Sequence, residues 1–348
     1  MSKTFNFINS VKGGCGKTTF SIFLSTFFAK YSGNLSNDGL LIDVDLQGTS
    51  LQHLMYGEEN ENAENDIKYL HDAVEYPDNF RNFIQTPIIA EDKNKEFIRL
   101  NMIFSNPDIK MKKLYRISPQ YGYTPAVQHS IYQGGMQELL QNIAKSEEYN
   151  HLIFDMPPSS EGFSQIAMDC VLNDNNSKIC KKGDKINIFF VTTLDSAQVK
   201  VVRDEVYDFL SEINTIHEYQ IFIIINNPFG NTFFTTEESN IDEHYKNAYK
   251  IFDDFYNKTT NKLVQEMKEK VYFLTMPFQQ RYLKKCVNSK GLAILEGDTS
   301  QEDSENSTDL SSTDQALPVT PVDGIFVNGA KKKIAIDTWK NLFYEKLN

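Results

Sequence analysis

A glycine-rich loop near the N-terminus constrains the fold of this chain more than any other stretch. It follows an apolar run at residues 5–11 that is typical of a strand, and it reads Lys12-Gly13-Gly14-Cys15-Gly16-Lys17-Thr18-Thr19. From Thr18 to about Tyr31, apolar residues recur with the spacing of one helical face, at Phe20, Phe23, Leu24, Phe27 and Phe28. A strand, a glycine loop, a lysine, a hydroxyl and a helix in this order predict a phosphate-binding loop.

The loop carries the groups that bind a phosphate chain. Glycine adopts backbone angles closed to other residues, so the N–H groups of Gly13, Gly14 and Gly16 can turn inward around an anion. The N-terminus of the following helix favours the same negative charge. Lys17 is expected to reach the β- and γ-phosphates, and the Thr18 hydroxyl to ligate Mg²⁺. The alternative is a glycine-rich turn that only leads into a core helix.

Carboxylates follow two other predicted strands. Asp43 and Asp45 come directly after a short buried strand at residues 40–42, and Asp155 ends an apolar strand that begins at His151. Open α/β sheets bind their ligands at the carboxyl ends of the strands. A carboxylate at Asp155 is expected to hold Mg²⁺ through a water, because Mg²⁺ keeps much of its hydration shell. The alternatives are an aspartate pair that caps a turn and a structural aspartate at a strand end.

Together these stretches resemble the deviant Walker A ATPases of the ParA/MinD family, and they are most similar to ParA. Asp-x-Asp-x-Gln-Gly at residues 43–48 resembles the Walker A′ motif, and Asp-x-Pro-Pro-Ser at residues 155–159 resembles the Walker B pattern. The resemblance implies that Lys12 crosses a dimer interface to the partner's nucleotide. It also implies that Asp45 orients the attacking water and that Asp43 lies near the metal. A solvated surface lysine is the alternative for Lys12.

The same resemblance assigns contacts in the second half of the chain. Residues 220–226 form a continuous apolar run, typical of a central parallel strand. In the family an asparagine at this strand end contacts adenine, which points to Asn226, although a turn-forming asparagine is the alternative. Pro277 takes the position of the proline that packs beside the base. ParA proteins often contact DNA through basic residues further on, here Arg281, Lys284 and Lys285, for which a solvated charged face is the alternative.

The implied fold is one P-loop ATPase domain over residues 1–348. Its core is a doubly wound, mainly parallel sheet with helices on both faces and with surface insertions. Residues 52–133 and 228–270 diverge from the family. Residues 297–330 are acidic and without Lys or Arg, and we expect a mobile insertion there. A C-terminal helix at residues 331–348 is expected to pack on the core, with a basic membrane-binding helix as the alternative.

Finer expectations concern element boundaries. The sequence predicts a strand at residues 97–105, no clear period at 115–132, and a helix at 134–144. A strand at 186–192 leads into a helix that Ser196 could cap. Residues 271–277 are expected to form the last strand of the sheet, while residues 325–327 form either a short docking strand or no element.

Composition narrows the partners and the location. The formal net charge is −12, so the chain as a whole lacks the positive field of a nucleic-acid binder, although a local basic face remains open. The cysteines show no metal-type pairing, which favours reduced thiols in the cytoplasm; they are Cys15, Cys170, Cys180 and Cys286. No signal-like segment opens the sequence, and no apolar run is long enough to span a bilayer.

The expected function is therefore a ParA-type ATPase that acts as a switch. ATP and Mg²⁺ would hold a homodimer together and hydrolysis would separate it, under the control of a ParB-like or other stimulating partner. Non-specific DNA is the expected matrix for partition of a plasmid, chromosome or other cargo. The alternatives are a MinD-like membrane-associated positioning ATPase and a bacterial tyrosine kinase, whose C-terminal tyrosine cluster is represented here only by Tyr344.

Overall fold

The centre of the molecule is a nine-stranded sheet in the order β11-β10-β9-β8-β7-β1-β6-β2-β5. The run from β9 to β5 is parallel, and β10 and β11 continue it antiparallel beyond β9. The strands are β1 (Thr4–Ser10), β2 (Gly39–Asp43), β5 (Asn101–Ile103), β6 (His151–Pro158), β7 (Lys185–Thr193), β8 (Tyr219–Asn227), β9 (Val271–Pro277), β10 (Ile325–Val327) and β11 (Ala330–Lys332). This computed structural model describes residues 2–31, 38–45, 51–52, 55, 68–91, 97–106, 125–158, 165–213, 215–227, 238–258, 261–277, 325–327 and 330–332.

Both faces of the parallel strands are buried, which explains their continuous apolar sequences. In β1, Phe5 and Phe7 join the hydrophobic core on one face, while Ile8 joins the core on the other. In β8, Ile223 and Phe222 divide between the same two cores. The prediction of a central parallel strand at residues 220–226 is confirmed, and so is the doubly wound, mainly parallel fold.

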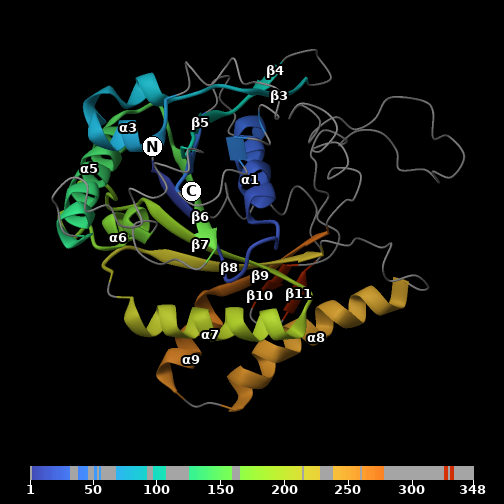
Figure 1. Ribbon diagram of the computed structural model, residues 1–348. Helices are drawn as coiled ribbons and strands as arrows, with labels where there is room; N and C mark the ends of the chain where they lie inside the picture. Colours follow the sequence, from blue (N-terminus) through green and yellow to red (C-terminus); the bar gives the residue numbers. More distant parts are fainter. Residues whose placement is uncertain are drawn as a thin grey trace, which may run out of the picture.

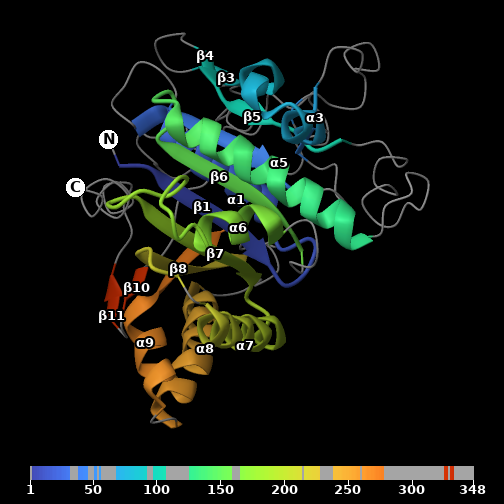
Figure 2. The ribbon, with the colours of Figure 1, turned by 90° about the vertical axis from the view of Figure 1, so that its left-hand side faces the viewer.

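Helices cover the two faces unequally (Figures 1 and 2). Among the described residues, α1 covers one face, and the whole predicted apolar stripe of this helix is buried. The opposite face carries α5, α6 and α7, with α8 and α9 packed against α7. The bounds are α1 (Lys17–Tyr31), α5 (Pro125–Lys145), α6 (Ile166–Leu172), α7 (Ser196–Glu212), α8 (Glu238–Lys258) and α9 (Lys262–Lys270). In this part of the chain, no helix is both long and apolar enough to cross a bilayer.

Part of the segment 52–133 forms a cap on the β5 side of the sheet (Figure 2). It packs on α5, and Gly135 of α5 allows this approach because a Cβ there would overlap the Val74 carbonyl oxygen. The ion pair between Arg81 and Glu148 joins the cap to the turn that follows α5. Its elements are α3 (Leu70–Glu75), the 3₁₀ helix η1 (Pro77–Phe83), β3 (Ile88–Glu91) and β4 (Phe97–Arg99), before β5.

Several boundary predictions need correction. The strand expected at residues 97–105 is two strands, because β4 pairs with β3 in a separate two-stranded sheet and only β5 joins the main sheet. The helix expected from residue 134 begins at Pro125, within the stretch without a clear period; proline suits a first helical turn, where its missing N–H is not needed. Asp195, not Ser196, caps α7, since its carboxylate accepts the N–H of Ala197 at 2.8 Å.

The C-terminal expectations also change. β9 is not the last strand, since residues 325–327 form β10 and pair with it. Lys331 and Lys332 do not open a helix but lie in β11, paired with β10. Residues 298–324 and 333–348, including the rest of the expected acidic insertion and of the terminal helix, lie outside the described residues.

Candidate functional site

The glycine loop lies at the carboxyl end of β1. After this strand the chain passes through α1 to β2, which lies on the far side of β6 from β1. Gly14 and Gly16 have φ values of +79° and +93°, a region that other residues rarely adopt, so the loop needs glycine at both positions. Lys12 and Gly13 are exposed, whereas the Cys15 side chain is buried and its pKa is raised by that burial. This is the strand, loop and helix geometry that the sequence predicts for phosphate binding.

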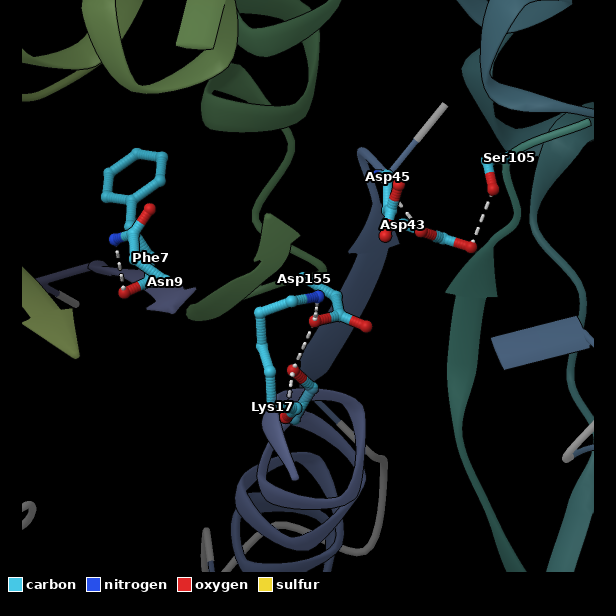
Figure 3. A network of polar contacts seen from close by, with 8 residues as sticks. Phe7, Asn9, Lys17, Asp43, Asp45, Ser105 and Asp155 are labelled. Atoms are coloured by element: carbon cyan, nitrogen blue, oxygen red, sulfur yellow. Dashed lines mark hydrogen bonds and ion pairs between the residues drawn. The ribbon is translucent and has the colours of Figure 1, made fainter. Parts of the chain in front are cut away.

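Lys17 begins α1 and is paired with Asp155 of β6 beneath the loop (Figure 3). Its Nζ lies 2.7 Å from Asp155 Oδ1, and the Ser21 hydroxyl donates to the same oxygen at 3.0 Å. Burial lowers the pKa of Lys17, but the charge of Asp155 and its hydrogen bond, with Asp45 and Asp43, outweigh this effect and raise the pKa. The ammonium group is therefore held charged at the place where phosphates would arrive.

Asp43 and Asp45 lie at the end of β2, next to β6 and its Asp155. Both carboxylates are buried. The Ser105 hydroxyl, from the residues after β5, donates to Asp43 Oδ2 at 2.7 Å, and the backbone N–H of Asp45 donates to Asp43 Oδ1 at 3.1 Å (Figure 3). Burial first, and then the charge of Asp155, raise the pKa of Asp43 to about 8, although the Ser105 hydrogen bond opposes the shift. An additional cation at this position would favour the ionised form of Asp43.

Asn226, at the end of β8, touches the glycine loop itself. Its side-chain amide donates to the Cys15 carbonyl at 2.8 Å, and a Cβ on Gly16 would overlap this amide nitrogen. Pro277 ends β9 and is paired in register with Asn227. The sheet thus brings both residues of the expected base site to the same carboxyl end as the loop, while their contact with adenine stays a prediction.

A magnesium ion fits the residues at this place. In the described part of the chain, no three His, Cys, Asp or Glu side chains form a ready-made metal cluster. Mg²⁺ sites for nucleotides do not require one, because phosphates and waters supply most of the ligands beside one or two carboxylates. Thr18, half-buried at the start of α1, and the carboxylates of Asp43 and Asp155 are the residues that would hold the ion.

The sequence-predicted residues divide into two groups. The loop residues up to Thr19, Asp43, Asp45, Asp155, Asn226 and Pro277 all come to one end of the sheet. The expected DNA contacts, Arg281, Lys284 and Lys285, lie outside the described residues.

Sequence reasoning missed two hydroxyls of the site, Ser21 and Ser105. Ser21 follows Lys17 by one helical turn, and Ser105 comes at a strand's carboxyl end, so position alone signalled both.

Comparison with known proteins agrees with this geometry. Residues 2–173, about half of the chain, match the family model of an AAA domain. The matched segment includes the glycine loop and Asp43, Asp45 and Asp155. Residues 2–173 are therefore similar to an AAA domain, and the motifs that resemble the ParA/MinD ATPases lie within them. No curated protein sequence matches the chain significantly.

Solved structures extend the likeness of the fold beyond this domain. The cell division ATPase MinD of Pyrococcus furiosus superposes with a TM-score of 0.51 at 13% identity, over 88% of this chain and 93% of that protein. The ParA family ATPase of Chlorobium tepidum TLS gives a TM-score of 0.50 at 14% identity, over 84% and 90%. The β7 to β9 half of the sheet therefore belongs to the same kind of fold as the matched domain.

Proposed function

We propose that this protein is a ParA-type ATPase whose bound nucleotide switches it between a dimer and separate subunits. The observation that carries the proposal is the convergence of Lys17, Asp155, Asp43 and Asp45 beneath a loop with two left-handed glycines. The match of residues 2–173 to an AAA domain supports the same chemistry. We also propose a cytoplasmic location, which the free thiols of Cys15, Cys170 and Cys180 favour.

The chain's own residues account for each requirement of the reaction. The N–H groups of the loop and the N-terminus of α1 bind the phosphates, and Lys17 leaves Asp155 to meet them. Asp45 holds the attacking water, while Lys12, exposed on the loop, is free to reach a second subunit's nucleotide. Mg²⁺, when bound, neutralises charge that develops on the transferred phosphoryl group. Catalysis is then mostly positioning and electrostatic stabilisation.

The first test measures ATP hydrolysis and subunit association together. Sedimentation velocity with Mg-ATP, with ADP and without nucleotide should show a dimer only with ATP. Asp45→Ala should hydrolyse at least about a hundredfold more slowly and stay dimeric, since it retains the binding groups. A monomeric Asp45→Ala protein in saturating Mg-ATP would contradict the proposal.

The matrix is tested with a non-specific DNA duplex at moderate salt. Binding should require ATP, fall with salt, and weaken when Arg281, Lys284 and Lys285 are changed to Ala together. The control triple Lys178, Lys181 and Lys182 to Ala removes as many charges from exposed positions near the amino end of β7. If the dimer forms but DNA does not bind, ATP-dependent binding to anionic liposomes that is lost on truncation after Lys332, which keeps β11, would assign the MinD-like alternative.

A further inference from the structure

We propose that Ser105 is a positioning residue for nucleotide hydrolysis, which fixes the Asp43 carboxylate and through it the backbone at Asp45. The inference rests on the proposed ATPase function and adds a residue from the segment 52–133 to that site. It starts from a chain of two hydrogen bonds, from Ser105 Oγ to Asp43 Oδ2 and from Asp45 N to Asp43 Oδ1 (Figure 3).

The Asp43 carboxylate joins two separate backbone segments. Ser105 is 1% exposed and Asp43 is 2% exposed, so water does not compete for these hydrogen bonds. Each carboxylate oxygen accepts from a different segment, one beyond β5 and the other beyond β2. Two such bonds define the plane of the carboxylate and hold the start of the turn that carries Asp45.

Ser105 is itself held in place by other residues of the segment 52–133. β5 pairs in register with β2, with Ile42 opposite Ile103, so Ser105 emerges beside the end of β2. On its other side, the N–H of Leu70 donates to the Phe104 carbonyl at 2.8 Å. Gln85 and Met102 exchange backbone hydrogen bonds of 2.7 and 2.8 Å. The cap elements α3 and η1, together with β5, thus fix the Ser105 hydroxyl relative to Asp43.

This arrangement predicts an effect on the chemical step more than on ATP binding. The proposed phosphate-binding groups belong to the loop between β1 and α1 and to α1 itself, whereas Ser105 donates to Asp43 at the end of β2. Removal of the hydroxyl leaves Asp43 Oδ2 buried without this donor, and the carboxylate can then turn and release the Asp45 N–H. A loosely held Asp45 lowers the fraction of bound nucleotide that has a correctly placed water.

The experiment compares Ser105→Ala and Ser105→Thr with wild type and with Ser146→Ala. Ser146 is a matched control, because its hydroxyl is also buried but donates to the Ile143 carbonyl at the amino end of the strands. We expect Ser105→Ala to lower kcat about tenfold to a hundredfold, with KM for ATP within about twofold of wild type. Ser105→Thr, which keeps the hydroxyl, should recover most of kcat. By sedimentation, Ser105→Ala should still form the ATP dimer, with a longer lifetime.

Three outcomes would overturn the role of Ser105, and a fourth would refute the proposed function instead. If wild type hydrolyses ATP and Ser105→Ala has the same kcat, the hydroxyl does not position the site. If KM rises while kcat is unchanged, or if Ser146→Ala falls equally at a matched folded fraction, the effect is general destabilisation. A Ser105→Thr variant that folds but stays as slow as Ser105→Ala also contradicts a role for the hydroxyl. Wild-type protein without ATPase activity and without an ATP dimer would instead refute the proposed function.

Discussion

The amino and carboxyl ends of the central strands both bury polar side chains, but in different ways. At the amino end, Lys3 and His151 lie in a network of hydrogen bonds to backbone and side-chain groups. At the carboxyl end, the carboxylates of Asp43, Asp45 and Asp155 all act on Lys17. One end is arranged for stability, and the other keeps buried charge that suits a charged ligand.

The amino-end network combines backbone carbonyls, one carboxylate and neutral side chains. The Lys3 ammonium donates to the carbonyls of Ser146 and Tyr149, and its backbone N–H donates to Asp184 at 2.7 Å. His151 Nδ1 lies 2.9 Å from the Thr4 hydroxyl. Asn6 and Asn187 continue the network across β1 and β7 with a hydrogen bond of 2.9 Å. These hydrogen bonds tie the amino ends of β1, β6 and β7 together, although Asp38 Oδ1 beside them is buried without a hydrogen-bond partner.

The carboxyl end retains unused hydrogen-bonding capacity. The side-chain oxygen of Asn9, beside the glycine loop, is buried without a hydrogen-bond partner, and so is the Thr192 hydroxyl. Burial, followed by the charge of Asp155, raises the pKa of Asp43 to about 8, whereas burial lowers the pKa of His151 to about 4. Buried polar side chains therefore occur at both ends, and the carboxyl end is distinguished by the three carboxylates that surround Lys17.

The largest expected effect separates the two buried lysines. Lys17→Met should lower ATP hydrolysis by about 10²–10³-fold, because a donor that stabilises transition-state charge is lost. Lys3→Met should leave kcat nearly unchanged and instead lower the free energy of unfolding by about 1–3 kcal/mol, since two carbonyls lose their donor. Steady-state kinetics and urea unfolding of both variants check this. Equal loss of kcat in both would remove the distinction between the two ends.

The amino end should also weaken in acid. Because the folded pKa of His151 lies near 4 and its ordinary value is 6.5, the unfolded chain binds more protons between these values. The contribution of His151 is complete above about pH 6.5, and up to about 3 kcal/mol of it is lost as the pH falls to 4. Urea unfolding of His151→Asn should show a flatter dependence on pH over this window. An unchanged slope would contradict the assignment to His151.

The carboxyl end should show the opposite dependence on pH. Asp43 has its folded pKa raised from 3.8 to about 8, so the folded chain binds more protons in this window and stability falls as the pH rises through it. Asp43→Asn keeps a donor and an acceptor but not the charge. In the absence of nucleotide and Mg²⁺, it should be more stable than wild type by at least about 1 kcal/mol at pH 8, and by less at pH 5. A variant less stable at pH 8 would show that the charge is well compensated.

The smallest effect concerns the cap that supports the carboxyl end. Gly135→Ala places a methyl group against the Val74 carbonyl and 2.8 Å from its Cγ1, and should destabilise the protein by about 1–3 kcal/mol despite better helix propensity. Gly134→Ala, on the same helix with no atom within 4 Å of the new Cβ, should be neutral or stabilising by up to about 1 kcal/mol. Thermal or urea unfolding distinguishes them. A similar response to both would mean that the cap does not depend on this close packing.

Local patterns predicted much of the fold. The apolar runs at residues 40–42, 151–155 and 220–226 are buried parallel strands, because a strand covered on both faces must be apolar throughout. The stripe after Lys17 is the buried face of α1. Where the pattern was weak, prediction failed. The first turns of α5 have no visible period, and β4 and β5 read as one strand because sequence does not show that they join different sheets.

The sequence by itself determined the ligand-binding end of the sheet. Its glycine loop, its two lysines and the aspartates at strand ends are local signals, and each needs only its neighbours to be read. Tertiary structure decided how these groups meet. The pairing of Lys17 with Asp155, the contact of Asn226 with the loop and the reach of Ser105 to Asp43 depend on strand order and register. No local pattern encodes that order, because it results from competition among distant strands for the same two cores.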